Sequence, residues 1–517
     1  MPAPSFELAV VAESTAAAKA AMDVLERGGS AADAAAVALL VAGVVQPVSS
    51  GLGGGGFALY WDNAAQKSTL LDFRESAPFG IKDFEWTPKK HGPMVGVPGE
   101  LAGIVEMHRR WGKLALGEHL RVAALLARDG FSLGRHMHRA LRWNKSWVLG
   151  DEAARQVFSP TGTLAAHGDT VKNEALARTL ELVASEGHES FYRGAIAQDI
   201  VAAVRSAGGH MVDSDLSGYA VIERPPLEVR WNDHRIVGAA PPSGGGLMTA
   251  EALAMHEPNE LRSLEHQSGA YLHVLAESMR AALADHVRFV GDPAYLKIDP
   301  QKLLATERLR ARRARISLDR TSRAEDLPLD ERGTASFVAV DAAGNAVAVT
   351  TSLNDMFGAR LMTNGFPLND QLLNFTTEAQ SLRYHANLRP NTPRAGARPG
   401  ASLAPTIVLR GDRPVLVVAA SGGWRIPGVV AQTVLGHLLF ARPLARAAND
   451  LRIHTPPSGG LWLDPRAPPE LVADLKRRGE VIVTLPDYSA VAAIAVRGAH
   501  PVEAVADPRK GGQSLLR

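Results

Sequence analysis

The pattern of hydrophobic and polar positions changes from helical to strand-like beyond residue 332. Residues Thr15 to Val45 predict two alanine-rich helices separated at a Gly-Gly-Ser sequence, where Ser30 can cap the second helix. A glycine loop then leads into an apolar strand, and another strand is expected over Ser68 to Phe73. From about Val97 to Pro300 the spacing of apolar residues is mostly helical. The clearest helices are expected over Leu101 to Trp111, Leu120 to Arg128, Ile196 to Ala207 and Tyr271 to Phe289, with one strand-like segment over Leu227 to Ala239.

A charged segment, Gln301 to Arg332, separates the helical part from the strand-rich part. It holds nine lysines or arginines and few large apolar residues, a composition typical of a helix that frays into a solvated connector. Such a connector is compatible with a site of chain cleavage. Beyond it the pattern predicts two hairpins, one helix and two later strands. These are Ser336 to Val340 with Ala346 to Ser352, Pro405 to Leu409 with Val415 to Ala419, Pro427 to Phe440, Val481 to Thr484 and Ala490 to Val496.

Helices followed by hairpins, with little regular strand-helix-strand alternation, predict an α+β fold of layered sheets covered by helices. The chain of 517 residues is 46% apolar, so it can bury a large core. Its 56 basic and 54 acidic residues nearly balance, which argues against nucleic acid or an anionic membrane as a partner. The absence of cysteine excludes disulfides, thiolate metal sites and cysteine nucleophiles.

The longest apolar run, Ala34 to Val45, has 12 residues, whereas a membrane-spanning helix needs about 20. The first residues lack the basic and apolar regions of a secretory signal. We therefore expect a cytoplasmic location for the chain as written, or a periplasmic one if a leader was trimmed or missed.

Three motifs resemble known functional sites but fit ordinary structural roles better. Gly51 to Gly56 lacks the Lys-Ser/Thr of a phosphate loop and precedes a strand, so close backbone packing is the better interpretation. Gly130 to Gly134 matches the G-x-S-x-G motif of serine hydrolases, yet a helix precedes it, and Gly130 is expected to end that helix. His136 and His138 are not part of an H-E-x-x-H motif, and no metal site is expected there.

A fourth constellation points to chemistry. Thr334 follows Gly333 between the charged connector and an apolar strand. A threonine hydroxyl becomes a useful nucleophile when cleavage frees its own α-amine as the base. Gly422 and Gly423, between a strand and a helix, can present backbone N–H groups to an oxyanion. Taken alone, Thr334 is also an ordinary strand former, and the glycine pair is also an ordinary turn.

Ten segments together resemble the γ-glutamyltransferase (glutathione hydrolase) family in their order and over nearly the whole chain. They are GGSAADAA (Gly28 to Ala35), SSGLGGGGFALYW (Ser49 to Trp61), LDFRESAP (Leu71 to Pro78), VGVPGELAG (Val95 to Gly103), FYRGAIAQDI (Phe191 to Ile200), Pro241 to Gly246, GDPAY (Gly291 to Tyr295), TASFVAVDAAGNAVAVTTSLN (Thr334 to Asn354), RPGASLAPTIV (Arg398 to Val408) and SGGWRI (Ser421 to Ile426).

The resemblance implies a four-layer αββα sandwich of the N-terminal-nucleophile hydrolase type, self-cleaved into two interlocked subunits. The large subunit would be residues 1–333 and the small subunit residues 334–517. Thr334 would be the nucleophile, Ser352 would support its amine, and Gly422 and Gly423 would form the oxyanion hole. No cofactor is expected. The substrates would be a γ-glutamyl or related acyl amide and an amine or water acceptor.

The resemblance also implies a pocket for the glutamyl group. Arg74 would clamp the α-carboxylate beside Ser402, while Asn354 and Gln371 would receive the α-ammonium. Asn374 departs from the family, which has an aspartate there to pair with that ammonium; Ala401 replaces a second serine. Leaving a buried ammonium without its carboxylate costs on the order of 2–5 kcal/mol. Thr376 to Ala397, with Tyr384, occupies the position of the family's lid over the pocket.

Three functions therefore compete. The first is a self-processing threonine amidohydrolase or acyltransferase that acts on γ-glutamyl amides such as glutathione. The second is a related acylase for a glutaryl-like group without the α-amine, which Asn374 and Ala401 would favour. The third is an uncleaved, non-catalytic binding protein, against which Thr334, Ser352 and the glycine pair argue together.

Overall fold

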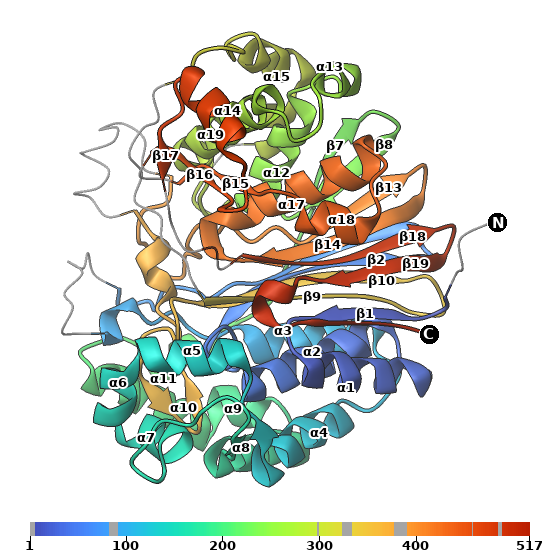
Figure 1. Ribbon diagram of the computed structural model, residues 1–517. Helices are drawn as coiled ribbons and strands as arrows, with labels where there is room; N and C mark the ends of the chain where they lie inside the picture. Colours follow the sequence, from blue (N-terminus) through green and yellow to red (C-terminus); the bar gives the residue numbers. More distant parts are fainter. Residues whose placement is uncertain are drawn as a thin grey trace.

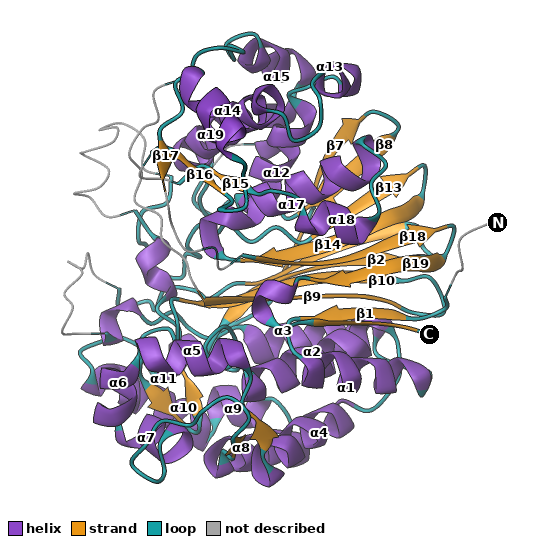
Figure 2. Ribbon diagram, in the orientation of Figure 1, coloured by secondary structure: helices purple, strands orange, loops and turns teal. Residues whose placement is uncertain are grey.

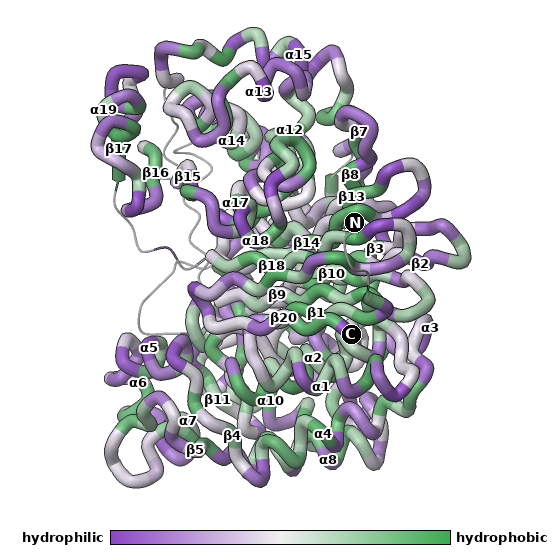
Figure 3. Tube along the Cα trace, turned by 45° about the vertical axis from the view of Figure 1, so that its right-hand side comes forward, coloured by the Kyte–Doolittle hydropathy of each residue, from purple (hydrophilic) through white to green (hydrophobic). Residues whose placement is uncertain are grey.

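The computed structural model describes residues 6–81, 91–296, 299–322, 333–376, 390–456, 459–483, 487 and 489–517. Two β-sheets pack face to face at its centre, and helices cover the outer face of each (Figures 1 and 2). Hydrophobic residues gather in the sheets and in the helix faces that rest on them (Figure 3). The four layers confirm the expected αββα sandwich. Among the described residues no helix is long and apolar enough to cross a membrane.

The first sheet has seven strands in the order β20-β1-β9-β10-β2-β3-β6, and every neighbouring pair is antiparallel. Alternate residues face opposite layers: Val347 and Val349 of β10 lie in the helix-side core, and Ala346 and Ala348 lie in the core between the sheets. Because both faces are covered, β9 and β10 are apolar throughout most of their length. The strands are β1 (Ala9–Ala12), β2 (Gly55–Asp62), β3 (Lys67–Phe73), β6 (Ile222–Arg224), β9 (Gly333–Val340), β10 (Ala346–Asn354) and β20 (Gln513–Leu516).

The second sheet has six strands in the order β19-β18-β14-β13-β8-β7. The segment expected to be one strand over Leu227 to Ala239 is a hairpin, because the polar pair Asn232 and Asp233 forms a two-residue turn in which Asn232 has a φ of 55°. The strands are β7 (Leu227–Trp231), β8 (His234–Gly238), β13 (Thr406–Arg410), β14 (Arg413–Ser421), β18 (Ala490–Arg497) and β19 (His500–Ala506).

The helices under the first sheet come from the first half of the chain. Ser30 caps α2 as expected: its hydroxyl accepts from the Asp33 N–H, and the Asp33 carboxylate accepts from the Ser30 N–H. The helices of this layer are α1 (Thr15–Glu26), α2 (Ala31–Val45), α3 (Glu100–Trp111), α4 (Leu116–Asp129), α5 (Arg135–Trp143), α6 (Lys145–Gly150), α7 (Glu152–Phe158), α8 (Glu174–Glu186), α9 (Glu189–Arg193), α10 (Ala195–Ser206) and α11 (Asp213–Ser217).

The second helical layer covers the other sheet. It consists of α12 (Gly245–Ala254), α13 (Pro258–Ser263), α14 (Gly269–Phe289), α15 (Thr306–Arg313), α17 (Ile426–Val434), α18 (Leu444–Asn449) and α19 (Pro469–Arg477). The small strands β15 (Ile453–His454), β16 (Leu461–Leu463) and β17 (Ile482–Val483) lie beside it (Figure 1). Two further strand pairs, β4 (Phe131–Ser132) with β5 (Thr170–Val171) and β11 (Met362–Thr363) with β12 (Phe366–Pro367), lie at the opposite end of the molecule (Figure 3).

The charged segment after residue 300 is more structured than its composition predicts. Arg308 and Arg312 of α15 both form ion pairs with the buried Asp285 of α14, and Arg308 also contacts the buried Glu251. The two arginines therefore neutralise acids inside the second helical layer, which the composition alone did not indicate. The helical part of the prediction agrees with α15, and most residues of 301–322 are exposed or partly exposed. Residues 323–332, the remainder of the expected connector, lie outside the described residues.

The structure confirms the ordinary interpretation of two motifs. A Cβ atom added to Gly53 or Gly56 would lie 2.1 or 2.2 Å from a backbone carbonyl oxygen, so the glycine loop serves close packing. Gly130 ends α4 with a φ of 102°, and the exposed Ser132 follows it on the two-residue strand β4.

Candidate active site

Thr334 lies buried at the start of β9, directly opposite Ser352 of β10. The two hydroxyl oxygens are 3.4 Å apart. The Ser352 hydroxyl donates to the carbonyl oxygen of Gly333 at 2.6 Å and accepts from the Asn354 N–H at 2.8 Å. Because hydrogen bonding polarises a carbonyl, the peptide bond that precedes Thr334 is activated towards attack by a nearby hydroxyl.

The predicted oxyanion glycines follow the last residue of β14. Gly422 has a φ of 126° and Gly423 a φ of 65°, and a Cβ on Gly422 would lie 2.6 Å from the Ser489 Cα. Both positions therefore favour glycine. Strand β14 packs on β9. The ammonium of Lys510 contacts both Thr334 and Ser421, the residue that precedes the glycines. The structure thus brings the glycine turn and Thr334 together from segments far apart in the sequence.

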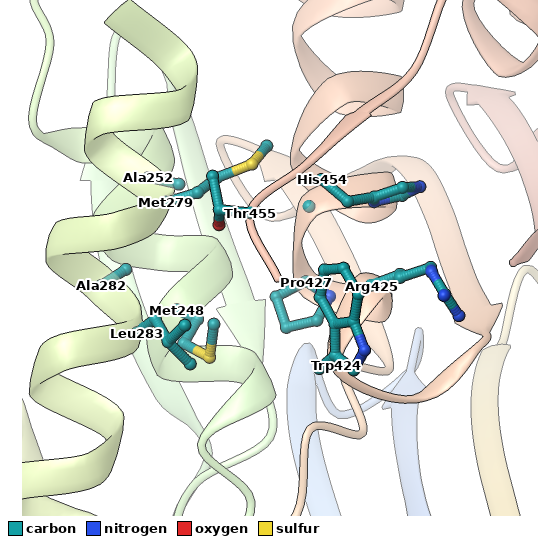
Figure 4. A pocket seen from close by; sticks show the side chains of 11 residues that line it. Met248, Ala252, Met279, Ala282, Leu283, Trp424, Arg425, Pro427, His454 and Thr455 are labelled. Carbon is teal, nitrogen blue, oxygen red and sulfur yellow. The ribbon is translucent and has the colours of Figure 1, made fainter. Parts of the chain in front are cut away.

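The residues after the glycines line a small, mainly apolar cavity, shown in Figure 4. Trp424 and Pro427 border it on one side, and Met248 and Met279, from helices α12 and α14, border it on the other. The Arg425 guanidinium lies 4.7 Å from the centre of the Trp424 ring. Trp424 and Arg425 thus belong to the short helical turn Gly423–Arg425, which begins directly after Gly422.

Arg74 follows β3 and is completely buried. Its guanidinium donates to the carbonyl oxygen of Gly400 at 3.0 Å and to that of Pro399 at 3.4 Å, and it lies 3.7 Å from the Glu75 carboxylate. Ser402, two residues beyond Gly400, is also buried. The structure therefore brings Arg74 close to the segment that carries Ser402, as the carboxylate clamp requires.

The amide side chains predicted for the pocket come from the end of β10 and from the short helical turn Gln371–Asn374. Asn354, with a φ of 77°, donates through Nδ2 to Asp370 at 3.2 Å. Within the described part of the chain, the Asn354 Oδ1 and both amide atoms of Gln371 are buried without a hydrogen-bond partner. Asn374 is buried in the same turn, and its backbone carbonyl accepts from Asn391.

Sequence reasoning missed three charged residues beside this site: Glu13, Asp370 and Lys510. Burial, followed by the charge of Asp355, raises the pKa of Asp370 to about 7. Lys510 lies 176 positions from Thr334 and 89 positions from Ser421 along the chain. No local pattern singles out a lysine whose contacts arise only when two sheets pack, so the sequence offered no usable signal for it.

Two stacked sheets with a buried threonine at the start of a central strand define a hydrolase of the N-terminal-nucleophile class. A family model described as gamma-glutamyltranspeptidase matches residues 17–516, and the chain belongs to that family. A glutathione hydrolase proenzyme from Pseudomonas aeruginosa is 31% identical, over 98% of this chain and 94% of its own length. One from Bacillus subtilis is 29% identical, over 95% of this chain and 88% of its own length.

Solved structures extend the comparison. The γ-glutamyltranspeptidase of Helicobacter pylori is similar with a TM-score of 0.58 and 28% identity, covering 60% of this chain and 92% of its own. A cephalosporin acylase from Bacillus halodurans matches with a TM-score of 0.87, covering 100% of this chain and 98% of its own. Because its identity is 23%, that likeness concerns the fold alone.

Proposed function

We propose that the chain cuts itself between Gly333 and Thr334 and then cleaves γ-glutamyl amides such as glutathione, transferring the acyl group to water or an amine. The observation that carries the proposal is the arrangement of Thr334, Ser352 and the Gly333 carbonyl. The name "proenzyme" borne by the relatives supports a processing step.

Self-cleavage needs the groups of this arrangement and one water molecule. The Thr334 hydroxyl attacks the Gly333 carbonyl carbon, while the Ser352 hydroxyl donates to the carbonyl oxygen. The C–N bond breaks, the nitrogen takes the proton of the hydroxyl, and an ester links Gly333 to Thr334. Water then hydrolyses the ester and leaves Thr334 with a free α-amine and a free hydroxyl.

In turnover the same hydroxyl attacks the substrate amide. The freed α-amine takes its proton and returns it to the leaving amine, and the N–H groups of Gly422 and Gly423 hold the oxyanion. An acyl-enzyme forms at Thr334, and water or an amine acceptor resolves it. Residues 1–333 and 334–517 would remain together as the two subunits of the enzyme.

The pocket supports a glutamyl acyl group. The planar guanidinium of Arg74, beside Ser402, suits the α-carboxylate. The Asn354 and Gln371 side chains present buried oxygens that find no donor among the described residues. A substrate ammonium would supply the missing donors, and a glutaryl group would leave these atoms unpaired.

A glutaryl-type acylase remains the second candidate because of one observation. Asn374 is neutral, so the pocket lacks the carboxylate that the family places opposite the ammonium. The ratio of kcat/KM for γ-glutamyl and glutaryl p-nitroanilides separates the candidates. A ratio well above one supports the first, and a ratio below one supports the second.

The expected lid, including Tyr384, falls mostly outside the described residues.

Replacing Thr334 by Ala tests the mechanism itself. The variant should stay a single uncut chain without anilide hydrolysis, because the attacking hydroxyl is gone. The wild type should give fragments 1–333 and 334–517 by intact mass under denaturing conditions. Thr334→Ser, which keeps a hydroxyl, should still cleave, more slowly. Hydrolysis by the alanine variant, or an uncut and inactive wild type, would contradict the proposal.

A further inference from the structure

A buried lysine, remote in sequence from the predicted catalytic residues, lies against the nucleophile. Lys510, in the short turn Pro508–Lys510, is 4% exposed. Its ammonium donates to the Thr334 carbonyl oxygen at 2.8 Å and to the Ser421 hydroxyl at 2.6 Å, and it pairs with the Glu13 carboxylate at 3.1 Å. The hydrogen bonds to Thr334 and Ser421 use two of the three N–H donors of the ammonium, and Glu13 adds the opposite charge as an ion pair.

The Glu13 carboxylate extends this arrangement to the next residues of β9. One oxygen pairs with Lys510, and the other accepts from the Ser336 N–H at 3.0 Å and from the Ser336 hydroxyl at 2.6 Å. Three segments thus meet at one ammonium: the start of β9, the end of β14 and the turn between β1 and α1. The contact on the Thr334 carbonyl restricts rotation about its backbone, which directs both its α-amine and its side chain.

The charge of Lys510 matters as well as its hydrogen bonds. The backbone N and O of one residue lie about 3 Å apart, so the ammonium is within about 6 Å of the Thr334 nitrogen. A nearby positive charge disfavours protonation of an amine. At an effective dielectric constant of about 20, the resulting shift in the amine pKa is on the order of one to two pH units, which Glu13 partly offsets.

The other ionisable groups around this cluster are few among the described residues. The charge of Lys510 also acts on His136 of α5. Burial, followed by the positive charge of Lys510, lowers the pKa of His136 to about 3. It is therefore neutral and adds no charge near pH 7. The pocket side carries Arg74 and Asp370. Glu13 is thus the one acid in contact with Lys510 among the described residues.

We propose that Lys510 is a positioning residue that clamps Thr334 against the oxyanion turn and keeps the freed α-amine in its base form near neutral pH. This inference rests on the function proposed above. It assigns a task to the C-terminal residues and to Glu13, which belong to opposite sides of the predicted cut. The clamp therefore also links the two subunits at the nucleophile.

The test compares Lys510→Met with Lys510→Arg. The methionine variant should lose the clamp and the charge: kcat falls 10- to 100-fold with little change in KM, and the acid limb of the kcat–pH profile moves up by about one unit. The arginine variant keeps the charge, so its acid limb should stay in place. Arg280→Met, which removes a buried cation of the outer layer, is the matched control and should leave the limb unmoved.

The Glu13→Gln variant should shift the acid limb of the kcat–pH profile in the opposite direction. This result does not depend on the folding of the Lys510→Met variant. Removing the negative charge should move the acid limb to lower pH, because the ammonium then acts on the amine without offset. All profiles use whichever anilide the wild type hydrolyses. If the acid limb of the kcat–pH profile does not move in either Lys510→Met or Glu13→Gln, the proposed role of Lys510 is wrong. An uncut, inactive wild type contradicts the proposed function instead.

Discussion

At the scale of single residues, the site combines ordinary side chains with uncommon surroundings. Thr334 and Ser352 are two hydroxyls facing each other across neighbouring strands, a pairing usual in sheets. The uncommon part is what surrounds them: the Gly333 carbonyl oxygen accepts from the Ser352 hydroxyl, and the Thr334 carbonyl oxygen accepts from the ammonium of Lys510. In the proposed acyl pocket, Asn374 is the side chain that we expect to decide between γ-glutamyl and glutaryl substrates.

Asn374→Asp tests that decision. A carboxylate in this buried turn would pair with a substrate ammonium, so the preference for γ-glutamyl over glutaryl p-nitroanilide should rise at least about 10-fold. The measurement is the ratio of the two kcat/KM values at one pH. Ala401→Ser is the matched control: it restores a hydroxyl near the carboxylate clamp, which both substrates share, and should leave the ratio nearly unchanged. An unchanged ratio in Asn374→Asp would place the amine-binding group elsewhere.

Among the helices and strands, buried polar side chains at helix ends help to determine how neighbouring helices are joined. Asp33 caps α2 and also accepts from the Lys113 N–H at 2.7 Å and from the His119 ring at 3.1 Å. Opposing the effect of burial, these hydrogen bonds, with that of His119 first, lower its pKa from 3.8 to about 2. One fully buried carboxylate therefore connects α2 with the segment that joins α3 to α4.

Asp33→Asn should lower the thermal midpoint by a few degrees at pH 7, since a shift of about two pKa units corresponds to about 2.5 kcal/mol. The folded-state pKa is depressed, so this stabilisation is complete above pH 4 and is lost as the pH falls towards 2. The difference in thermal midpoint between wild type and variant should therefore become smaller over that pH range, measured in thermal scans at one heating rate. Asp23→Asn, at an exposed position of α1, is the control and should have the same thermal midpoint as the wild type. A difference for Asp33→Asn that does not change with pH would refute the depressed pKa of Asp33 as its cause.

Local patterns predicted most of the elements, and the errors have identifiable causes. The helices α1, α2, α3, α10 and α14, and the strands β3, β9, β10 and β18, are confirmed within a few residues. The pattern missed the turn between β7 and β8 because Asn232 and Asp233 interrupt an otherwise apolar run by only two residues. It also missed the ion pairs of Arg308 and Arg312, because Asp285 comes to them from another helix.

Across the entire fold, the predicted cut falls after the first residue of β9, and strands from before and after it alternate in the first sheet. In the order β20-β1-β9-β10-β2-β3-β6, strands from before and after Thr334 are neighbours at three places. In the second sheet, β13 from the later part pairs with β8 from the earlier part. The parts of the chain before and after the predicted cut are therefore joined by strand pairing and by both hydrophobic cores.

The fragments should consequently remain together after cleavage. Size exclusion of the processed protein in native buffer should give one peak that contains both, and they should separate only when denaturant unfolds the sheets. The Thr334→Ala chain is the control, because it should elute at the same volume without being cut. Release of either fragment from folded protein in high salt would contradict this interleaving, since apolar contacts and strand pairing resist salt.

Local spacing and residue type were enough to predict most of the elements, the helix cap at Ser30, the motifs of the family and the candidates Thr334, Gly422 and Gly423. The folded chain was needed to show that Ser352 contacts the Gly333 carbonyl, that Asn354 contacts Asp370 and that Glu13 and Lys510 lie at the site. Such contacts form between strands and turns that are far apart in the chain. They arise from the packing of one sheet on another, which leaves no periodic signal in the sequence.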